Sequence, residues 1–99
     1  MKLIILSWAE QDLLNGRDFY DAQEPGVGEY FLDCLSADIE SLAYYAGIHR
    51  KVGRYYRALS RVFPYALYYK IDEEEVRVWA VLDCRRDPAW ISRQLRLRT

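Results

Sequence analysis

The sequence predicts a single α+β domain in which a helical hairpin packs on a small, curved antiparallel sheet. The 99-residue chain is long enough for one hydrophobic core and too short for two. Apolar residues recur every three or four positions over residues 27–46, which indicates a helix. Residues 54–82 change to an approximate period of two, which indicates strands. The expected element order along residues 1–99 is β-α-α-β-β-β-α.

The chain begins with a predicted strand and a predicted helix. Residues 2–6 are mostly aliphatic and β-branched, as is typical of a strand. Ser7 and Glu10 have the spacing of a capping box, in which each side chain bonds the backbone amide of the other residue. We therefore expect a helix over residues 8–23.

A second helix is predicted with a stronger pattern. Pro25 and Gly26 interrupt the first helix and favour a tight turn. The apolar stripe that follows predicts a helix over residues 27–46, antiparallel to the first, with Gly47 at its C-terminal cap. The polar residues Glu29, Asp33, Ser36 and Glu40 lie on its other side, which gives the hairpin an acidic outer surface.

Three strands and a final helix are predicted in the second half of the chain. A polar link over residues 49–53 precedes them, Pro64 separates the first two strands, and the charged turn 72–75 separates the last two. Asp87 and Pro88 suit the cap and the first position of a short C-terminal helix. The expected strands cover residues 54–62, 65–71 and 76–82.

Charge is distributed unevenly along the chain. Residues 1–49 carry nine acidic and two basic side chains, whereas residues 50–99 carry six acidic and twelve basic ones. This asymmetry indicates either a surface for an acidic partner or polyanion, or two oppositely charged layers that attract each other. No apolar run has the length of a membrane span, and no secretory signal is recognisable, so we expect a cytoplasmic protein that does not bind membranes.

Several kinds of catalytic and metal site are excluded by composition. The chain has one histidine and two cysteines, Cys34 and Cys84, which are too few for a zinc site or a disulfide framework. It has no phosphate-binding glycine loop, and its histidine, His49, lies in a polar link where it is poorly placed for a hydrolase triad. We expect no metal and no cofactor.

Arginines and aromatic residues in the basic half provide the candidate binding site. Arginine forks beside aromatic rings hold phosphates and stack on bases. Two of the arginines, Arg57 and Arg61, are expected on one face of a strand, about 13–14 Å apart. The alternative is that the aromatic residues fill the core while the arginines are solvated. The candidate target- or RNA-binding residues are Arg54, Arg57, Arg61, Arg85, Arg86 and Trp90.

Two segments resemble the C-terminal signature of the RelE/ParE toxin superfamily. They are FPYALYYKID, residues 63–72, and VRVWAVLDCRRDP, residues 76–88. The resemblance extends to the element order and so covers essentially the whole chain. It implies a small cytosolic toxin of a type II toxin-antitoxin, or plasmid stabilisation, module. Its partner would be a small antitoxin that wraps and neutralises it, and we expect a heterotetramer or a homodimer.

The superfamily contains two mechanisms, RelE-like and ParE-like, and the residues of this chain favour the ParE-like one. RelE-like members cleave messenger RNA on the ribosome, whereas ParE-like members inhibit DNA gyrase. Arg85 matches a basic residue of the family, but the preceding-strand arginine of RelE-like enzymes falls on Ala66, and their terminal tyrosine falls near Ile91, beside Trp90. The family's His-Gly pair is replaced by Asp83-Cys84, which puts an acid where a phosphate site favours a base.

We therefore expect a ParE-like toxin that inhibits growth by binding an essential target such as DNA gyrase. The first alternative is an mRNA endonuclease in which Arg57, Arg61, Arg85 and Arg86 clamp the scissile phosphate. The second is a family member that has lost its toxicity and acts as an interaction module. No catalytic residue is assigned.

Overall fold

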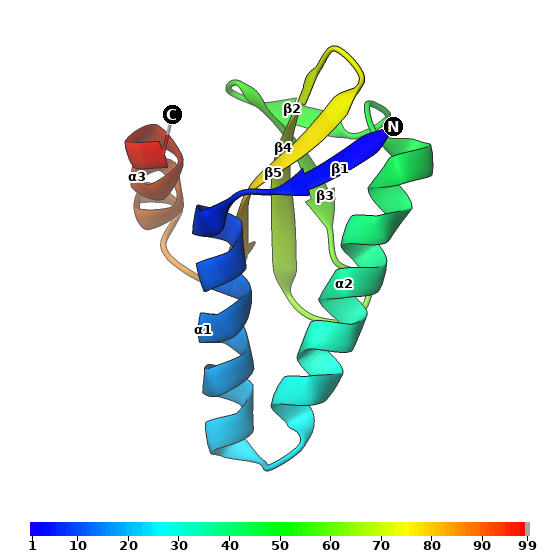
Figure 1. Ribbon diagram of the computed structural model, residues 1–99. Coiled ribbons are helices and arrows are strands. Elements are labelled where there is room, and N and C mark those ends of the chain that lie inside the picture. Colours follow the sequence, from blue (N-terminus) through cyan, green and yellow to red (C-terminus); the bar gives the residue numbers. More distant parts are fainter. Residues whose placement is uncertain (99) are drawn as a thin grey trace.

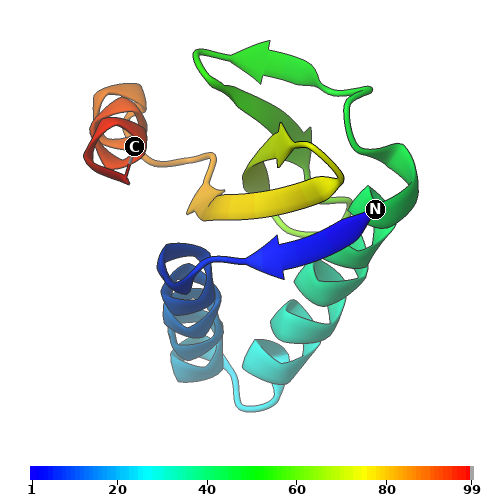
Figure 2. The ribbon, with the colours of Figure 1, turned by 45° about the horizontal axis from the view of Figure 1, so that its top comes forward.

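The computed structural model describes residues 1–98 and has the predicted α+β class (Figure 1). A helical hairpin covers one face of a five-stranded sheet, and a third helix lies beside the other face (Figures 1 and 2). None of the helices in this part of the chain is both long and apolar enough to cross a membrane. In chain order the elements are β1 (Lys2–Ile5), α1 (Ser7–Gln23), α2 (Val27–Tyr45), β2 (Arg50–Val52), β3 (Tyr55–Leu59), β4 (Tyr65–Asp72), β5 (Glu75–Asp83) and α3 (Pro88–Arg98).

The sheet is mixed, with strand order β1-β5-β4-β3-β2. The pairs from β2 to β5 are antiparallel as expected, but β1 is parallel to β5, so the prediction of a purely antiparallel sheet is wrong. The connection from β1 to β5 runs through both helices of the hairpin and strands β2 to β4, so it is long enough to permit parallel pairing. At this edge Lys2 donates its N–H to the carbonyl of Glu74 at 3.1 Å, and Leu6 donates to that of Val78 at 3.0 Å.

The sheet has an apolar layer on each face because its central strands are buried on both sides. On β4, Leu67 and Tyr69 face the hairpin, whereas Ala66 and Tyr68 face α3, and all four are at most 2% exposed. The hairpin contributes Ala9, Leu13, Phe31, Leu35, Ile39 and Leu42 to the larger layer. The smaller layer includes Leu95 of α3.

A β-bulge between β4 and β5 enlarges the layer under α3. Tyr68 pairs with Ala80 and Tyr69 pairs with Val78, which leaves Trp79 as an extra residue on β5. Trp79 and Ala80 therefore both pack in the layer on the α3 side.

Close backbone contacts fix the angle of the hairpin. A Cβ atom added to Gly16 of α1 would lie 2.5 Å from the ring of Phe31 on α2, so only glycine fits at this contact. The carboxylate of Asp21 accepts hydrogen bonds from the N–H groups of Gly26, at 3.0 Å, and Gly28, at 3.2 Å, which satisfies donors at the start of α2.

The expected boundaries hold closely for the helices and less well around β2 and β3. The capping box does not form, because α1 starts at Ser7 itself and Leu6 is the N-cap, without a side-chain hydrogen bond. The polar link contains the short edge strand β2, and β3 ends at Leu59. The predicted cap of α3 is confirmed, since Asp87 Oδ1 accepts the N–H of Ala89 at 3.0 Å.

Candidate functional site

A cleft of about 580 Å³ lies between α1 and α3, and we call it the α1–α3 cleft. Val81 and Leu82, near the end of β5, form its apolar floor. Phe19 of α1 and Trp90 of α3 line its two walls, and Phe19 is 49% exposed. An exposed aromatic ring beside an apolar floor is typical of a surface that binds another protein.

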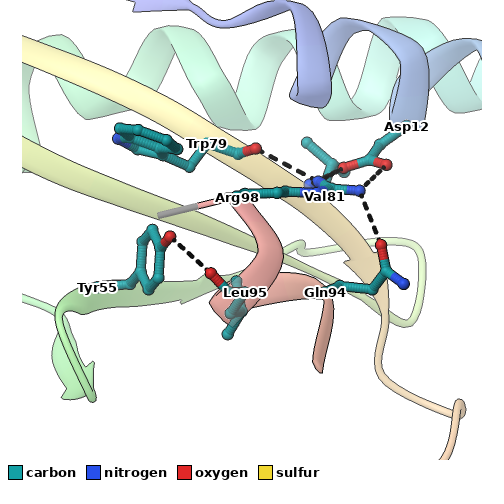
Figure 3. Close-up of polar contacts among 7 residues, drawn as sticks. All are labelled: Asp12, Tyr55, Trp79, Val81, Gln94, Leu95 and Arg98. Atoms are coloured by element: carbon teal, nitrogen blue, oxygen red, sulfur yellow. Dashed lines mark hydrogen bonds and ion pairs between the residues drawn. The ribbon is translucent and has the colours of Figure 1, made fainter. Parts of the chain in front are cut away.

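A buried ion pair closes one end of the cleft (Figure 3). Arg98 Nη1 lies 2.5 Å from Asp12 Oδ2, and Arg98 Nη2 lies 2.9 Å from Asp12 Oδ1. The side chains are 7% and 10% exposed. Asp12 Oδ2 also accepts the backbone N–H of Val81 at 2.9 Å, and Arg98 Nη1 donates to the carbonyl of Trp79 at 3.3 Å. The pair therefore ties α1, β5 and α3 together.

Arg85 lies at the other end of the cleft and is held by an acid. Its Nη2 and Nε atoms bond Asp83 Oδ2 at 2.8 Å and Oδ1 at 3.0 Å, and Nη2 also donates to the Tyr20 hydroxyl at 3.2 Å. The hydrogen bonds from Arg85 hold the pKa of Asp83 below its usual value. Burial raises the pKa of Tyr65, which also lines the cleft, to about 12. Asp83 is therefore ionised and Tyr65 protonated at neutral pH.

Arg86 is the exposed cation at this end of the cleft. Its guanidinium carbon lies 3.7 Å from the centroid of the Trp90 ring, a cation–π contact. Among residues 1–98 no carboxylate lies within ion-pair distance of Arg86. Arg86 and Trp90 therefore form a charged and aromatic pair available to a partner.

The other candidate arginines lie elsewhere. Arg57 points to the α3 side of the sheet, where it donates to the Tyr68 hydroxyl at 3.2 Å and contacts Cys84 Sγ at 3.5 Å. Arg61 bonds Asp38 of α2 at 3.1 Å on the hairpin side, and Arg54 lines a separate groove beside α3.

The prediction that Arg57 and Arg61 share one strand face is wrong. β3 ends at Leu59, and the N–H of Ser60 bonds the carbonyl of Tyr65 at 2.8 Å as the chain turns towards β4. Arg61 lies after this turn and reaches α2, so strand alternation does not apply to it. The structure brings together only Arg85, Arg86 and Trp90 of the six candidates.

Two charged residues of the cleft were missed by sequence reasoning. Asp12 is one of the nine acidic residues of the first half of the chain, and Arg98 is one of the twelve basic residues of the second half. They are 86 positions apart, and no local spacing indicates that they meet. Phe19, which is 49% exposed, was also not among the predicted site residues.

The histidine of the chain lies outside this cleft. His49 Nδ1 lies 2.6 Å from the Tyr69 hydroxyl, on the hairpin side of the sheet and outside the cleft. Over residues 1–98 no group of three or more His, Cys, Asp or Glu side chains is placed to hold a metal ion. The arrangement of apolar floor, aromatic walls and surface arginines is suited to binding.

The fold is that of a small α+β protein, and the cleft adds exposed aromatic and arginine side chains to its surface. A family model described as the ParE toxin of type II toxin-antitoxin systems, parDE, matches residues 3–88, and the chain belongs to this family. The match spans β1 to β5 and ends where α3 begins.

One solved structure with a similar fold is described as a chromosomal ParDE TA system from P. aeruginosa. The two chains share 17% identity, and the alignment has a TM-score of 0.76 and covers 82% of this chain and 92% of that one. The search of curated proteins found no match. The sequence resemblance and the predicted α+β class are confirmed by the family match and this structural neighbour.

Proposed function

We propose that this protein is the toxin of a type II toxin-antitoxin pair and inhibits growth by binding an essential target such as DNA gyrase. Membership of the ParE toxin family supports this proposal. The α1–α3 cleft supplies a surface for binding, with Phe19, Arg86 and Trp90 around an apolar floor. Binding alone is sufficient for inhibition of this kind.

The single observation that carries the choice of mechanism is the pairing of Arg85 with Asp83. Both carboxylate oxygens of Asp83 lie within 3.0 Å of the Arg85 guanidinium. A phosphate would have to displace this carboxylate or approach against its negative charge. Ala66, where the resemblance to RelE-like enzymes places an arginine, is fully buried. Of the groups that would stabilise charge in RNA cleavage, the preceding-strand arginine is therefore missing and Arg85 is already bound to Asp83.

Neutralisation by a cognate antitoxin is the second part of the proposal. A segment that covers the cleft would combine apolar side chains for the floor with acidic ones for Arg86. The complex would act in the cytoplasm, as a heterotetramer of toxin and antitoxin or with a toxin homodimer. Such assembly would leave the toxin inactive until the antitoxin is degraded.

Supercoiling by purified DNA gyrase tests the target directly. We expect excess protein to inhibit supercoiling, and Trp90→Ala with Arg86→Ala to weaken inhibition by about tenfold or more, because aromatic and arginine anchors dominate interfaces. Arg93→Ala is the matched control, since Arg93 is an exposed arginine of α3 that does not line the cleft. Unchanged supercoiling at excess protein would contradict the gyrase target.

Two further outcomes would replace the proposal by one of its alternatives. Ribosome-dependent cuts in messenger RNA, mapped by primer extension and abolished by Arg85→Ala, would establish an endonuclease. Normal colony counts on expression without antitoxin would indicate a non-toxic interaction module.

A further inference from the structure

Positive charge is concentrated on α3 and on the part of the sheet around β2 and β3. Residues 46–71 contain six Lys and Arg side chains and no Asp or Glu, and α3 contains three arginines and no acid. The acidic residues of the second half of the chain all lie in residues 72–87. The whole chain has a net charge of −1, so this positive surface results from how the fold separates the charges.

Three exposed arginines lie on the α3 side of the sheet, and we call them the basic rim. Arg54 in the β2–β3 turn and Arg96 on α3 line two sides of a hollow of about 650 Å³. Figure 2 shows this turn pointing towards α3. The third member, Arg50 on β2, is the register partner of Arg57, which contacts Tyr68 on the α3 side. Directly opposite residues of antiparallel strands share a face, so Arg50 lies on this side too.

The charges of the basic rim are not balanced within residues 1–98. No ion pair in this part of the chain involves a rim arginine or Arg57. Arg57 donates instead to the Tyr68 hydroxyl at 3.2 Å and to the Cys84 sulfur at 3.5 Å. Like charges directly opposite on neighbouring strands destabilise a sheet, and Arg50 and Arg57 are such a pair. A bound anion would offset this repulsion.

The floor of the hollow is closed to inserted groups and holds the rim in a fixed geometry. Its residues Tyr55 and Leu95 are 3% and 8% exposed, so they offer no surface for an aliphatic side chain or a stacked base. The Tyr55 hydroxyl donates to the Leu95 carbonyl at 3.1 Å (Figure 3). This bond holds α3 beside β3 and so fixes Arg96 relative to Arg54. A ligand of the rim is therefore recognised by its charge alone.

We propose that the basic rim binds the phosphate backbone of duplex DNA. The phosphates lie on the outside of a duplex, where guanidinium groups bind them without touching the bases. Single strands fit less well, because their binding uses exposed aromatic rings that stack on unpaired bases. On α3, Ser92 and Arg96 of the hollow lie on the opposite flank from Trp90 and Gln94 of the α1–α3 cleft. The site goes beyond the proposed function, since it requires neither gyrase nor this cleft.

The test is fluorescence anisotropy of a short fluorescein-labelled DNA duplex of mixed sequence, titrated with the full chain at several KCl concentrations. Three phosphate contacts predict that the logarithm of the association constant falls against the logarithm of salt concentration with a slope of about −2.7. Affinity should therefore fall by about 40-fold between about 50 and about 200 mM KCl. One strand of the same duplex should bind more weakly.

Variants of the rim arginines test where the duplex binds. Arg54→Ala/Arg96→Ala should lower affinity by about tenfold or more and reduce the steepness of the salt dependence by about two. The charge-matched control Arg17→Ala/Arg61→Ala removes two arginines that are paired with acids of the hairpin, and should leave affinity within about twofold. Arg50→Ala should reduce the steepness by about one without lowering the urea midpoint, because repulsion from Arg57 is lost. Circular dichroism shows whether each variant is folded.

Several outcomes would overturn the proposal. They are unchanged binding by the folded variant Arg54→Ala/Arg96→Ala, an equal loss of affinity in the charge-matched control, and binding that does not depend on salt. Tighter binding of a single strand or of an RNA duplex would assign the rim to a different nucleic acid. Displacement of the duplex by polyglutamate at equal charge concentration would assign it to an acidic protein. Gyrase inhibition is measured separately, so failure of the gyrase proposal leaves this result unchanged, and the reverse also holds.

Discussion

Arg98 and Asp12 join the end of the described chain to its first helix. Arg98 lies in the last turn of α3, Asp12 lies in α1, and their paired contacts of 2.5 and 2.9 Å form a bidentate fork. Trp8 of α1 covers the same guanidinium, 5.3 Å from the ring centroid. Because α3 packs on the sheet mainly through a small apolar layer, this fork sets the width of the α1–α3 cleft.

Removal of one partner of this pair should destabilise the protein strongly. Arg98→Leu leaves the Asp12 carboxylate buried with only the Val81 N–H as a partner. We expect a loss of about 3–5 kcal/mol in the free energy of unfolding, measured by urea denaturation. Arg93→Leu is the control and should change stability by less than about 1 kcal/mol.

The double variant Asp12→Leu/Arg98→Leu separates ion-pair loss from packing loss. It removes both charges, so no buried charge is left without a partner. Its loss in the free energy of unfolding should therefore be smaller than the sum of the losses in Asp12→Leu and Arg98→Leu. Additive losses would show that the two side chains stabilise the fold independently of each other.

The order of the elements was predictable except for the short edge strand β2, which lies in the predicted polar link, because each of the others follows from a local signal. The apolar stripe of residues 27–46 gave α2 to within one residue, and the alternation around residues 65–82 gave β4 and β5. The parallel pairing of β1 was not predictable in this way. It depends on which edge of the sheet is vacant, and a strand four residues long carries no information about its neighbour.

The candidate site was predictable only where its residues are close in sequence. Arg85, Arg86 and Trp90 meet because a short turn connects the end of β5 to α3. Asp83 was identified as an unusual acid, but its bidentate pairing with Arg85 requires the turn geometry. Arg61 was misplaced because periodicity does not show where a strand ends. Asp12 and Arg98 were missed because tertiary packing alone brings them together.

The contact between Gly16 and Phe31 gives a second stability prediction. In Gly16→Ala the new Cβ would lie 2.5 Å from the Phe31 ring, so the helices must separate or the ring must move. We expect a loss of about 1–3 kcal/mol in thermal or urea unfolding, as is usual for overpacking. Combining it with Phe31→Leu, which makes room, should cost less than the sum of the two single variants. A fully additive double variant would contradict a steric origin.

The contact between His49 and Tyr69 makes stability depend on pH. The Tyr69 hydroxyl accepts the Gly47 N–H at 2.9 Å and lies 2.6 Å from His49 Nδ1, an arrangement that suits a neutral imidazole. Burial lowers the pKa of His49 below its usual value of 6.5. As pH falls below about 6.5, the unfolded chain therefore takes up the proton first, and stability declines until the folded-state pKa is passed.

Urea unfolding at about pH 7.5 and about pH 5.5, on either side of the ordinary histidine pKa, tests this dependence. We expect a lower midpoint for the natural sequence at the more acidic value. His49→Asn keeps a polar side chain without a titrating group and should show a smaller difference. An equal or larger difference in His49→Asn would assign the pH dependence to other groups.

Asp38 should stabilise the fold more through its hydrogen bond with Ser60 than through its ion pair with Arg61. Its carboxylate is 8% exposed and accepts the Ser60 hydroxyl at 2.6 Å, which ties the β3–β4 turn to α2. The Arg61 side chain is 76% exposed, so its ion pair is screened by water and adds about 0–1 kcal/mol. We expect Asp38→Ala to cost about 1–3 kcal/mol in urea unfolding, because a buried hydrogen bond is lost. Arg61→Ala should cost less than about 1 kcal/mol. If Arg61→Ala instead loses more stability than Asp38→Ala, the exposed arginine rather than the serine anchors this turn.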